Sequence, residues 1–266
     1  MSKIGFFDSG VGGLSVLKEA LKLLPNDEFY YYGDSANCPY GIKGETFIQN
    51  RSFEITEHLV NDYGVEVVVV ACNTATSYAL SYLRSVFPNV SFLGMVPAVK
   101  PAAATTKTKV IGVLATKGTL NASLYKQIRD TYGCGSTIIE HIGEGFVELV
   151  ESFDISGQHA ERVVEDSIRD MVLAGADKLV LGCSHYPFLK DTIEMVANRI
   201  KPDSTPNIEV IDPAPAIARH LRSVVKETGF RISNSEFPNV KLESSGSNVI
   251  INQIFQKFCI NNFSNV

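Results

Sequence analysis

Two cysteines stand directly after runs of apolar residues that are typical of buried strands. In "VEVVVVACNTATSYAL" (65–80), Cys72 follows the valine run, and in "ADKLVLGCSHYPFL" (176–189), Cys183 takes the same position. A helix is expected to begin after each cysteine. The N–H groups at the start of a helix carry partial positive charge, and a thiol beside them ionises more readily. Both positions therefore predict a thiol that acts as a base or a nucleophile.

A pair of such thiols suits one reaction well. One thiolate removes a proton from one face of a carbon atom while the other thiol delivers a proton to the opposite face. Each sulfur must approach that carbon to roughly 3–3.5 Å, so the two sulfurs are expected roughly 6–7 Å apart. That separation is far longer than a disulfide bond of about 2.05 Å. The pattern predicts inversion of a stereocentre by two bases.

Strands and helices that could position these residues alternate along the chain. Gly64 and the prolines at 25 and 88 mark expected helix ends. The predicted helices span 14–24, 45–63 and 74–87, and the predicted strands span 3–7, 28–32, 90–96, 109–116, 136–142, 177–182 and 207–212, besides the valine strand. Apolar strands alternating with helices predict an α/β fold with mostly parallel sheets.

The two halves of this pattern resemble each other. "KIGFFDS" and "VIGVLAT" share a strand with Ile-Gly near its start, and Gly5 precedes Cys72 by 67 residues while Gly112 precedes Cys183 by 71. Chance spacing in an α/β protein is the alternative explanation. We expect two similar lobes, the first formed by 1–96 with 213–266 and the second by 97–212. The tail should pack on the first lobe.

Composition limits the classes of function. The 266 residues carry a net charge of −5, which does not favour nucleic-acid binding. No apolar run is long enough for a transmembrane helix, and the N-terminus lacks a signal-peptide pattern, so a cytoplasmic protein is expected. The five cysteines form no CxxC pattern, and no HExxH motif occurs, so no metal site is predicted. "SGVGG" does not match GxGxxG, so a dinucleotide cofactor is not expected.

Five segments together resemble a known family. "FFDSGVGGLSV", "GDSANCPYG", "VVVVACNTATSYAL", "GVLATKGTL" and "LVLGCSHYP" resemble, in the same order, the glutamate racemases of the aspartate/glutamate racemase superfamily. The similarity extends from the N-terminus to about Pro215. It implies two α/β lobes with the active site in the cleft between them, and interconversion of L- and D-glutamate without a cofactor. It also implies a supply of D-glutamate for peptidoglycan, with glutamate as the small-molecule partner. The oligomeric state is left open, and a homodimer is the assembly considered.

The resemblance also implies site residues. Cys72 and Cys183 match the two catalytic bases. The positions matching substrate-binding pairs are Asp8 and Ser9, Tyr40 and Gly41, Asn73 and Thr74, and Ser184 and His185. The family usually has threonine at 184, and serine keeps the hydroxyl. "GEGFVELVE" matches only loosely the family segment that contains an auxiliary catalytic glutamate, here Glu151.

Several of these residues have competing interpretations. Asp8 could hold the substrate ammonium or relay a proton with Cys72, or it could cap a helix. His185 could tune Cys183 or make a structural hydrogen bond. Thr116 and Thr119 could bind substrate or cap a helix. Polar side chains after the strands could bind the substrate carboxylate, where charge develops during deprotonation.

Two other functions remain to be weighed. "GCSHY" half-matches the G-x-S-x-G motif of hydrolases, with Ser184 as the nucleophile, but Tyr186 replaces the last glycine. A two-lobed binder of small anions also fits the fold, although it gives no reason for two activated thiols. The remaining cysteines, Cys38, Cys134 and Cys259, have no activating surroundings in the sequence.

Overall fold

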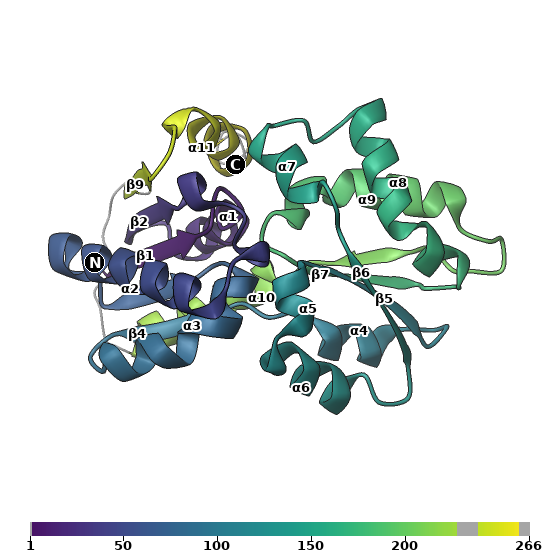
Figure 1. Cartoon of the computed structure of the whole chain (residues 1–266), viewed down its shortest axis with the longest axis horizontal. Helices are drawn as coiled ribbons and strands as arrows, with labels where there is room; N and C mark the ends of the chain where they lie inside the picture. The colour runs from purple at the N-terminus through teal and green to yellow at the C-terminus, as the bar shows by residue number, and fades with distance from the viewer. Residues whose placement is uncertain (1, 228–238, 261–266) are drawn as a thin grey trace. The chain divides into compact units, whose positions relative to one another are not determined.

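A computed structural model describes residues 2–227 and 239–260 of the chain. It contains two compact units, unit 1 comprising Met1–Met95 with Ala214–Val266, and unit 2 comprising Val96–Pro213. Each unit is built around its own parallel sheet with helices on both faces (Figure 1). The α/β class predicted from the sequence is confirmed. The predicted division into a lobe of 1–96 with 213–266 and a lobe of 97–212 remains a prediction.

Unit 1 contains a five-stranded sheet with the order β4-β3-β1-β2-β9, and every pair of neighbouring strands is parallel. Its strands are β1 (Lys3–Asp8), β2 (Glu28–Gly33), β3 (Val67–Val70), β4 (Ser91–Gly94) and β9 (Asn239–Ser244). Its helices are α1 (Leu14–Leu23), α2 (Glu45–Tyr63), α3 (Asn73–Val86), α10 (Ala214–Glu227) and α11 (Asn248–Ile254), with the short helices η1 (Ser35–Asn37), η2 (Tyr40–Ile42) and η4 (Phe255–Ile260). The tail contributes strand β9, which pairs with β2.

Unit 2 contains a four-stranded parallel sheet with the order β6-β5-β7-β8. Its strands are β5 (Val110–Ala115), β6 (Thr137–Ile142), β7 (Lys178–Gly182) and β8 (Glu209–Ile211). Its helices are α4 (Val99–Thr105), α5 (Lys117–Asn121), α6 (Ser123–Tyr132), α7 (Phe146–Glu151), α8 (Gln158–Leu173) and α9 (Lys190–Ile200), with the 3₁₀ helix η3 (Tyr186–Leu189).

The two sheets share one topology. In each unit the first strand is flanked by the second strand on one side and the third on the other, and the fourth lies beyond the third. Strands β2-β1-β3-β4 therefore correspond to β6-β5-β7-β8, and β9 is an addition in unit 1. This correspondence agrees with the internal similarity seen in the sequence.

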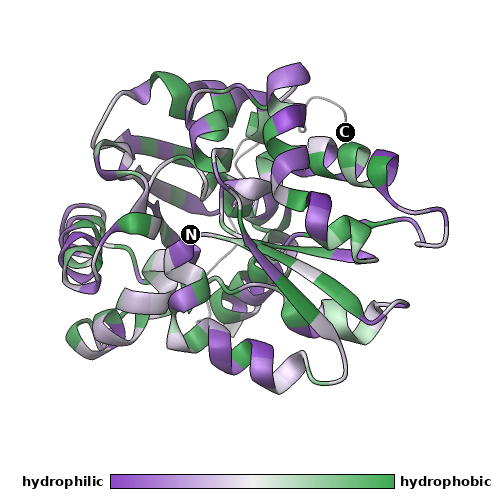
Figure 2. Ribbon diagram, turned by 45° about the vertical axis from the view of Figure 1, so that its right-hand side comes forward, coloured by the Kyte–Doolittle hydropathy of each residue, from purple (hydrophilic) through white to green (hydrophobic). Residues whose placement is uncertain are grey.

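Helices cover both faces of each sheet. In unit 1, α2 and α3 pack together against one face, while α1 packs with α10. In unit 2, α8 packs with α9, and α4 packs with α6. Because both faces are covered, the central strands are apolar along their length, whereas the helices have both an apolar and a polar side (Figure 2). All four residues of β3 are buried, and each buried valine contributes about 1.5–3 kcal/mol.

Local signals explain several element ends. Helix α2 has the predicted bounds, and Gly64 follows it with a φ of 67°, the left-handed conformation that glycine adopts without strain. The strand predicted at 90–96 is shorter, because after Gly94 the chain leaves the sheet toward α4. Among the described residues, no helix is both long enough and apolar enough to cross a membrane.

The helix expected after Cys183 is a short 3₁₀ helix. It is η3, which begins at Tyr186, and the α-helix α9 begins only at Lys190. Pro187 lies in the first turn of η3, where its lack of an N–H costs no hydrogen bond. Helix α3, by contrast, has Cys72 itself as its N-cap residue.

Candidate active site

The predicted site residues cluster at equivalent points of the two sheets. In unit 1, Asp8 ends β1 and Cys72 follows β3; in unit 2, Thr116 follows β5 and Cys183 follows β7. In each sheet the second strand lies on one side of the first strand, and the third and fourth strands lie on the other side. The loops that follow the first and third strands therefore lead in opposite directions from the carboxyl ends of these two neighbouring strands. Such a switch point is where open α/β sheets bind ligands.

Cys72 is held by the start of α3. Its Sγ accepts a hydrogen bond from the Ala75 N–H at 3.4 Å, and it lies 3.8 Å from the Ser9 hydroxyl oxygen. The residue is 4% exposed. A backbone N–H and the positive end of a fourteen-residue helix both favour negative charge on this sulfur.

Asp8 is not a helix cap. The N-cap of α1 is Gly13, and the fully buried Asp8 carboxylate accepts instead from the Gly10 N–H at 2.9 Å. A Cβ atom on Gly13 would lie 2.8 Å from the Ala71 Cβ and 2.9 Å from the Asp8 Cβ. Glycine at 13 therefore lets α1 approach the loops that hold Asp8 and Cys72.

Asn73 and Thr74 form the first turn of α3 and are both 2% exposed. The Asn73 side-chain Nδ2 donates to the Met95 carbonyl at 3.3 Å. Its Oδ1 is buried and has no hydrogen-bond partner in the part of the chain that the structure describes. An acceptor buried in this way costs free energy unless a donor reaches it, so Oδ1 is suited to a ligand N–H group.

Tyr40 belongs to a buried ionic network. Its hydroxyl donates to Asp34 Oδ2 at 2.6 Å, and the Arg51 guanidinium donates to both Asp34 oxygens at 3.0 and 2.8 Å. Burial would raise the pKa of Asp34, but the hydrogen bonds from Arg51, Tyr40 and Asn37 lower it below its ordinary value. Burial and the Asp34 carboxylate raise the pKa of Tyr40, so its phenol stays protonated. Gly41, the next residue, lies in η2 and is half-buried.

Sequence reasoning missed Asp34 and Arg51. The sequence did contain a signal for Asp34. It lies in "GDSANCPYG" directly after β2, at the edge where the carboxyl ends of the parallel strands lie side by side. Arg51 is the one Lys or Arg residue of α2, but nothing in its sequence neighbours points to Asp34, and only the fold shows that it reaches that carboxylate.

In unit 2, Cys183 shares its surroundings with His185. The Cys183 Sγ lies 3.9 Å from His185 Nδ1, and the other ring nitrogen, Nε2, lies 2.7 Å from Glu151 Oε1. Cys183 and His185 are 5% and 1% exposed. A carboxylate on one ring nitrogen stabilises an imidazolium, so this arrangement supports charge near Cys183 by a route that differs from the helix start at Cys72.

The other predicted residues of unit 2 are also near these loops. The buried Ser184 has its hydroxyl oxygen 3.5 Å from His185 Nδ1. Thr116 is the N-cap of α5, and its hydroxyl oxygen accepts from the Thr119 N–H at 3.2 Å while donating to the Thr119 hydroxyl at 3.0 Å. The capping role of Thr116 is therefore observed, and a role in substrate binding remains a prediction.

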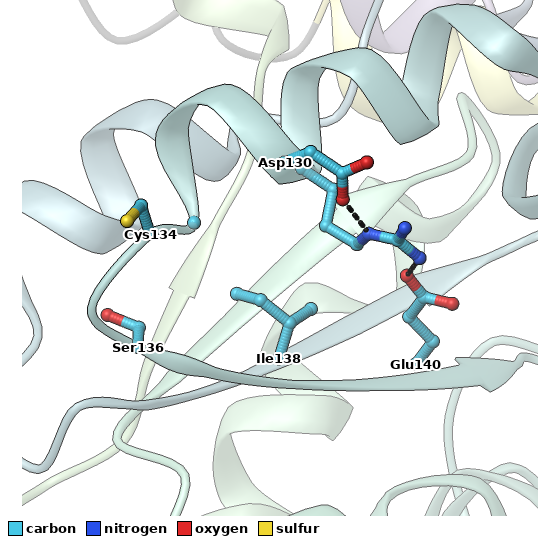
Figure 3. Close-up of a pocket in the computed structure, with 7 residues that line it drawn as sticks. Asp130, Cys134, Ser136, Ile138 and Glu140 are labelled. Carbon is cyan, nitrogen blue, oxygen red and sulfur yellow. Dashed lines mark hydrogen bonds and ion pairs between the residues drawn. The ribbon is translucent and has the colours of Figure 1, made fainter.

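The three remaining cysteines have no predicted role. Cys259 is buried, and burial raises its pKa to about 12. Cys38 is partly exposed, and Cys134 is exposed. Cys134 borders a shallow pocket of about 530 Å³ between α6 and β6, in which Arg129 pairs with Asp130 and Glu140 (Figure 3). No predicted site residue borders this pocket.

Known proteins resemble this chain over most of its length. The family model described as Asp/Glu/Hydantoin racemase matches residues 12–221. A glutamate racemase of Ectopseudomonas mendocina is 40% identical over 222 residues, which cover 84% of this chain and 81% of the relative. A glutamate racemase of Cupriavidus pinatubonensis is 40% identical over 243 residues, covering 91% of this chain and 86% of the relative.

Solved structures agree with these relatives. The crystal structure of Escherichia coli glutamate racemase in complex with L-glutamate and the activator UDP-MurNAc-ala has a TM-score of 0.83 at 29% identity, over 97% of this chain and 95% of that one. Glutamate racemase from Aquifex pyrophilus has a TM-score of 0.71 at 32% identity, over 97% and 94% of the two chains.

The two topologically matched sheets, each with a cysteine after its third strand, together with these relatives define an α/β isomerase. The chain belongs to the Asp/Glu/Hydantoin racemase family, and within it to the glutamate racemases.

Proposed function

We propose that the protein interconverts L- and D-glutamate by proton transfer at the α-carbon, with Cys72 and Cys183 as the two bases. The observation that supports this most directly is the equivalent placement of the two buried thiols, each after the third strand of its sheet. The relatives named glutamate racemase support glutamate as the substrate, as does the L-glutamate bound in the Escherichia coli structure.

The reaction balances without an external electron acceptor. One cysteine, as thiolate, takes the α-proton, and the electron pair of the C–H bond passes to the α-carbon and its carboxylate. The other cysteine, as thiol, then gives its proton to the opposite face and becomes the thiolate. At the end of the reaction the two cysteines have exchanged their protonation states, and the enzyme is ready to convert the opposite enantiomer of glutamate. The proposal therefore includes neither a cofactor nor a metal.

The surroundings of each thiol support this exchange. For Cys72, the Ala75 N–H and the start of α3 favour the thiolate. For Cys183, the His185 ring takes this role, and Glu151 orients the ring and stabilises its charged form. We assign Glu151 and His185 to the catalytic apparatus of Cys183, and Asp8 and Ser9 to that of Cys72.

The remaining polar groups are assigned to substrate binding. The unsatisfied Asn73 Oδ1 is suited to the substrate ammonium, and the hydroxyl groups and loop N–H groups are suited to its carboxylates. The residues assigned to binding are Asp8, Ser9, Tyr40, Gly41, Asn73, Thr74, Thr116, Thr119, Ser184 and His185.

Chiral analysis in deuterated water tests the proposal. Purified protein without added pyridoxal phosphate should convert L-glutamate to a mixture of enantiomers, and the D-glutamate should carry deuterium at the α-carbon. Retention of the α-protium during complete turnover would exclude exchange through two bases. Failure to racemise glutamate, with turnover of aspartate, would instead assign a different substrate.

We further propose that the D-glutamate supplies peptidoglycan synthesis from the cytoplasm, and that glutamate is the only class of partner the site requires, without nucleic acid or membrane. Expression of the chain in a bacterial strain that requires D-glutamate should remove that requirement. A homodimer is proposed as the assembly, and sedimentation analysis of the full chain would identify a monomer if it is wrong.

A further inference from the structure

Tyr186 occupies a specific place beside Cys183. The residue is 1% exposed, and its N–H donates to the Cys183 carbonyl at 3.2 Å, which closes the turn from Cys183 to Tyr186. Its hydroxyl donates to the Gly143 carbonyl at 3.3 Å, and its ring packs edge-on against Phe146 with the ring centroids 4.9 Å apart. Tyr186 therefore joins the turn that carries Cys183 to the segment that begins α7.

Glycine at 143 is explained by this phenol. A Cβ atom there would lie 2.7 Å from the Tyr186 hydroxyl oxygen, 2.8 Å from Cζ and 3.0 Å from Phe146. These distances are shorter than a side chain tolerates without displacing its neighbours. The backbone at Gly143 thus accommodates the phenol at close range, and any larger residue would push the ring away.

The turn and α7 are joined at two places. Tyr186 reaches Gly143 just before α7, while the preceding residue, His185, reaches Glu151 at the end of α7. A helix of this length spans about 9 Å. A turn held at one point can rotate about it, whereas a turn held at two points this far apart has a fixed orientation.

We propose that Tyr186 is a positioning residue for Cys183, and that its hydrogen bond to Gly143 fixes the turn that directs the Cys183 sulfur. The inference extends the proposed function, because it rests on the role of Cys183 as a base. Burial raises the pKa of Tyr186 well above its ordinary value, and the nearby Cys183 adds to this shift. The phenol therefore remains a donor throughout the working pH range.

The variant Tyr186→Phe removes only the hydroxyl. The turn should then move more freely, which lowers kcat about tenfold through poorer alignment while KM changes little. Reaction of Cys183 with iodoacetamide, followed peptide by peptide, should become at least threefold faster. Cys72, with 4% exposure against 5% for Cys183, is an internal control whose reaction rate should not change.

Tyr125→Phe is the matched control. Tyr125 is also 1% exposed in unit 2, and its hydroxyl donates to Glu140 at 2.8 Å, in a contact that does not involve the Cys183 turn. This variant should leave the alkylation of Cys183 unchanged. Gly143→Ala is a second test, because it displaces the phenol from the other side and should reproduce the Tyr186→Phe result.

The outcomes are distinct. Selective acceleration at Cys183 in Tyr186→Phe or Gly143→Ala, with reduced kcat, supports the proposal. Wild-type alkylation and kcat in both variants, or equal acceleration at Cys72 and Cys183, overturn it. If the wild-type protein does not racemise glutamate, the proposed function fails, whereas the alkylation of Cys183 still decides whether Tyr186 positions its turn.

Discussion

Cys72 and Cys183 follow equivalent strands of two sheets with the same topology, yet their sulfurs have different neighbours. Cys72 caps a long helix and accepts a backbone N–H, whereas Cys183 precedes a short 3₁₀ helix and lies beside the imidazole of His185. In the proposed two-base reaction, each sulfur must in turn be stabilised as a thiolate. The two units thus offer two different physical means of doing so, a helix start in one and a carboxylate-supported imidazole in the other.

Replacing either cysteine with serine should abolish racemisation. A serine hydroxyl is much less acidic than a thiol, so each variant loses one of the two bases, and kcat should fall by roughly a thousandfold or more. Polarimetry or chiral chromatography from both enantiomers measures this loss. The control is Cys134→Ser, because that thiol is exposed and borders the pocket at α6, which no predicted site residue lines. Substantial activity in Cys72→Ser or Cys183→Ser would contradict the two-base proposal.

Glu151 should affect catalysis through His185 without contributing to substrate affinity. In Glu151→Gln the ring nitrogen keeps a hydrogen-bond partner and loses the negative charge 2.7 Å away. We expect kcat to fall by about 10- to 100-fold, at or below the lower end of the roughly 10²–10⁴-fold contribution of a general acid or base itself, because Glu151 acts through His185, and KM should change little. Glu148→Gln, an exposed position on the same helix, is the matched control. Equal kinetic effects of the two substitutions would remove Glu151 from the site.

Much of the fold followed from local patterns in the sequence. The buried valines of β3, the αL glycine after α2 and the repeated strand pattern are local signals, and they predicted the α/β class and most elements. The short η3 could not be predicted in the same way, because "SHYPFL" has no distinct helical periodicity and its path depends on contacts with α7.

The site was less predictable than the fold, for a physical reason. Cysteines after apolar strands are visible in the sequence, as are the polar residues beside them. The partners of those residues come from distant parts of the chain, as Arg51 does for Asp34 and Gly143 for Tyr186. Such pairs depend on packing rather than on spacing, so only the tertiary structure identifies them.

The Asp34–Arg51 pair should contribute strongly to stability. Asp34 is fully buried, and Arg51→Met would leave its carboxylate without its cation, at a cost of about 2–4 kcal/mol in the free energy of unfolding by urea. Arg169→Met is the control, since Arg169 pairs with Glu165 at the surface and should cost under about 1 kcal/mol. Adding Asp34→Asn to Arg51→Met should recover part of the loss.

The pH dependence of the Asp34–Arg51 contribution follows from the lowered pKa of Asp34. A carboxyl group whose folded pKa is depressed stabilises the protein above its unfolded value, about 3.9, and that contribution is lost as the pH falls through the folded pKa. The difference in stability between wild type and Arg51→Met should therefore shrink on acidification. A difference that stays constant from pH 7 to pH 3 would contradict this account.

His58 should link α2 to the edge strand β9 in a pH-dependent way. Its Nδ1 lies 2.6 Å from Asp62 and its Nε2 lies 2.6 Å from Glu243. Burial would lower the pKa of His58, but its hydrogen bonds to Glu243 and Asp62 raise it above the ordinary value. The imidazolium therefore stabilises the fold fully below about pH 6.5, and this contribution is lost as the pH rises through the raised pKa.

The variant His58→Gln tests this link. Because His58 is partly exposed, the loss of stability should be modest, about 0.5–1 kcal/mol near pH 6, and it should decrease above the raised pKa. Hydrogen bonds to His58 and its neighbours lower the pKa of Glu243 despite burial. Once the pH is low enough to protonate Glu243, its attraction to the His58 imidazolium is lost, so the stabilisation also declines on the acidic side. His159→Gln is the control, because that side chain is 70% exposed and pairs only with Asp154 among the residues of the described structure. Urea titrations at pH 5, 6, 7 and 8 would measure both variants. A loss that grows with rising pH would show that the link does not depend on the imidazolium, since its stabilisation can only decline in that direction.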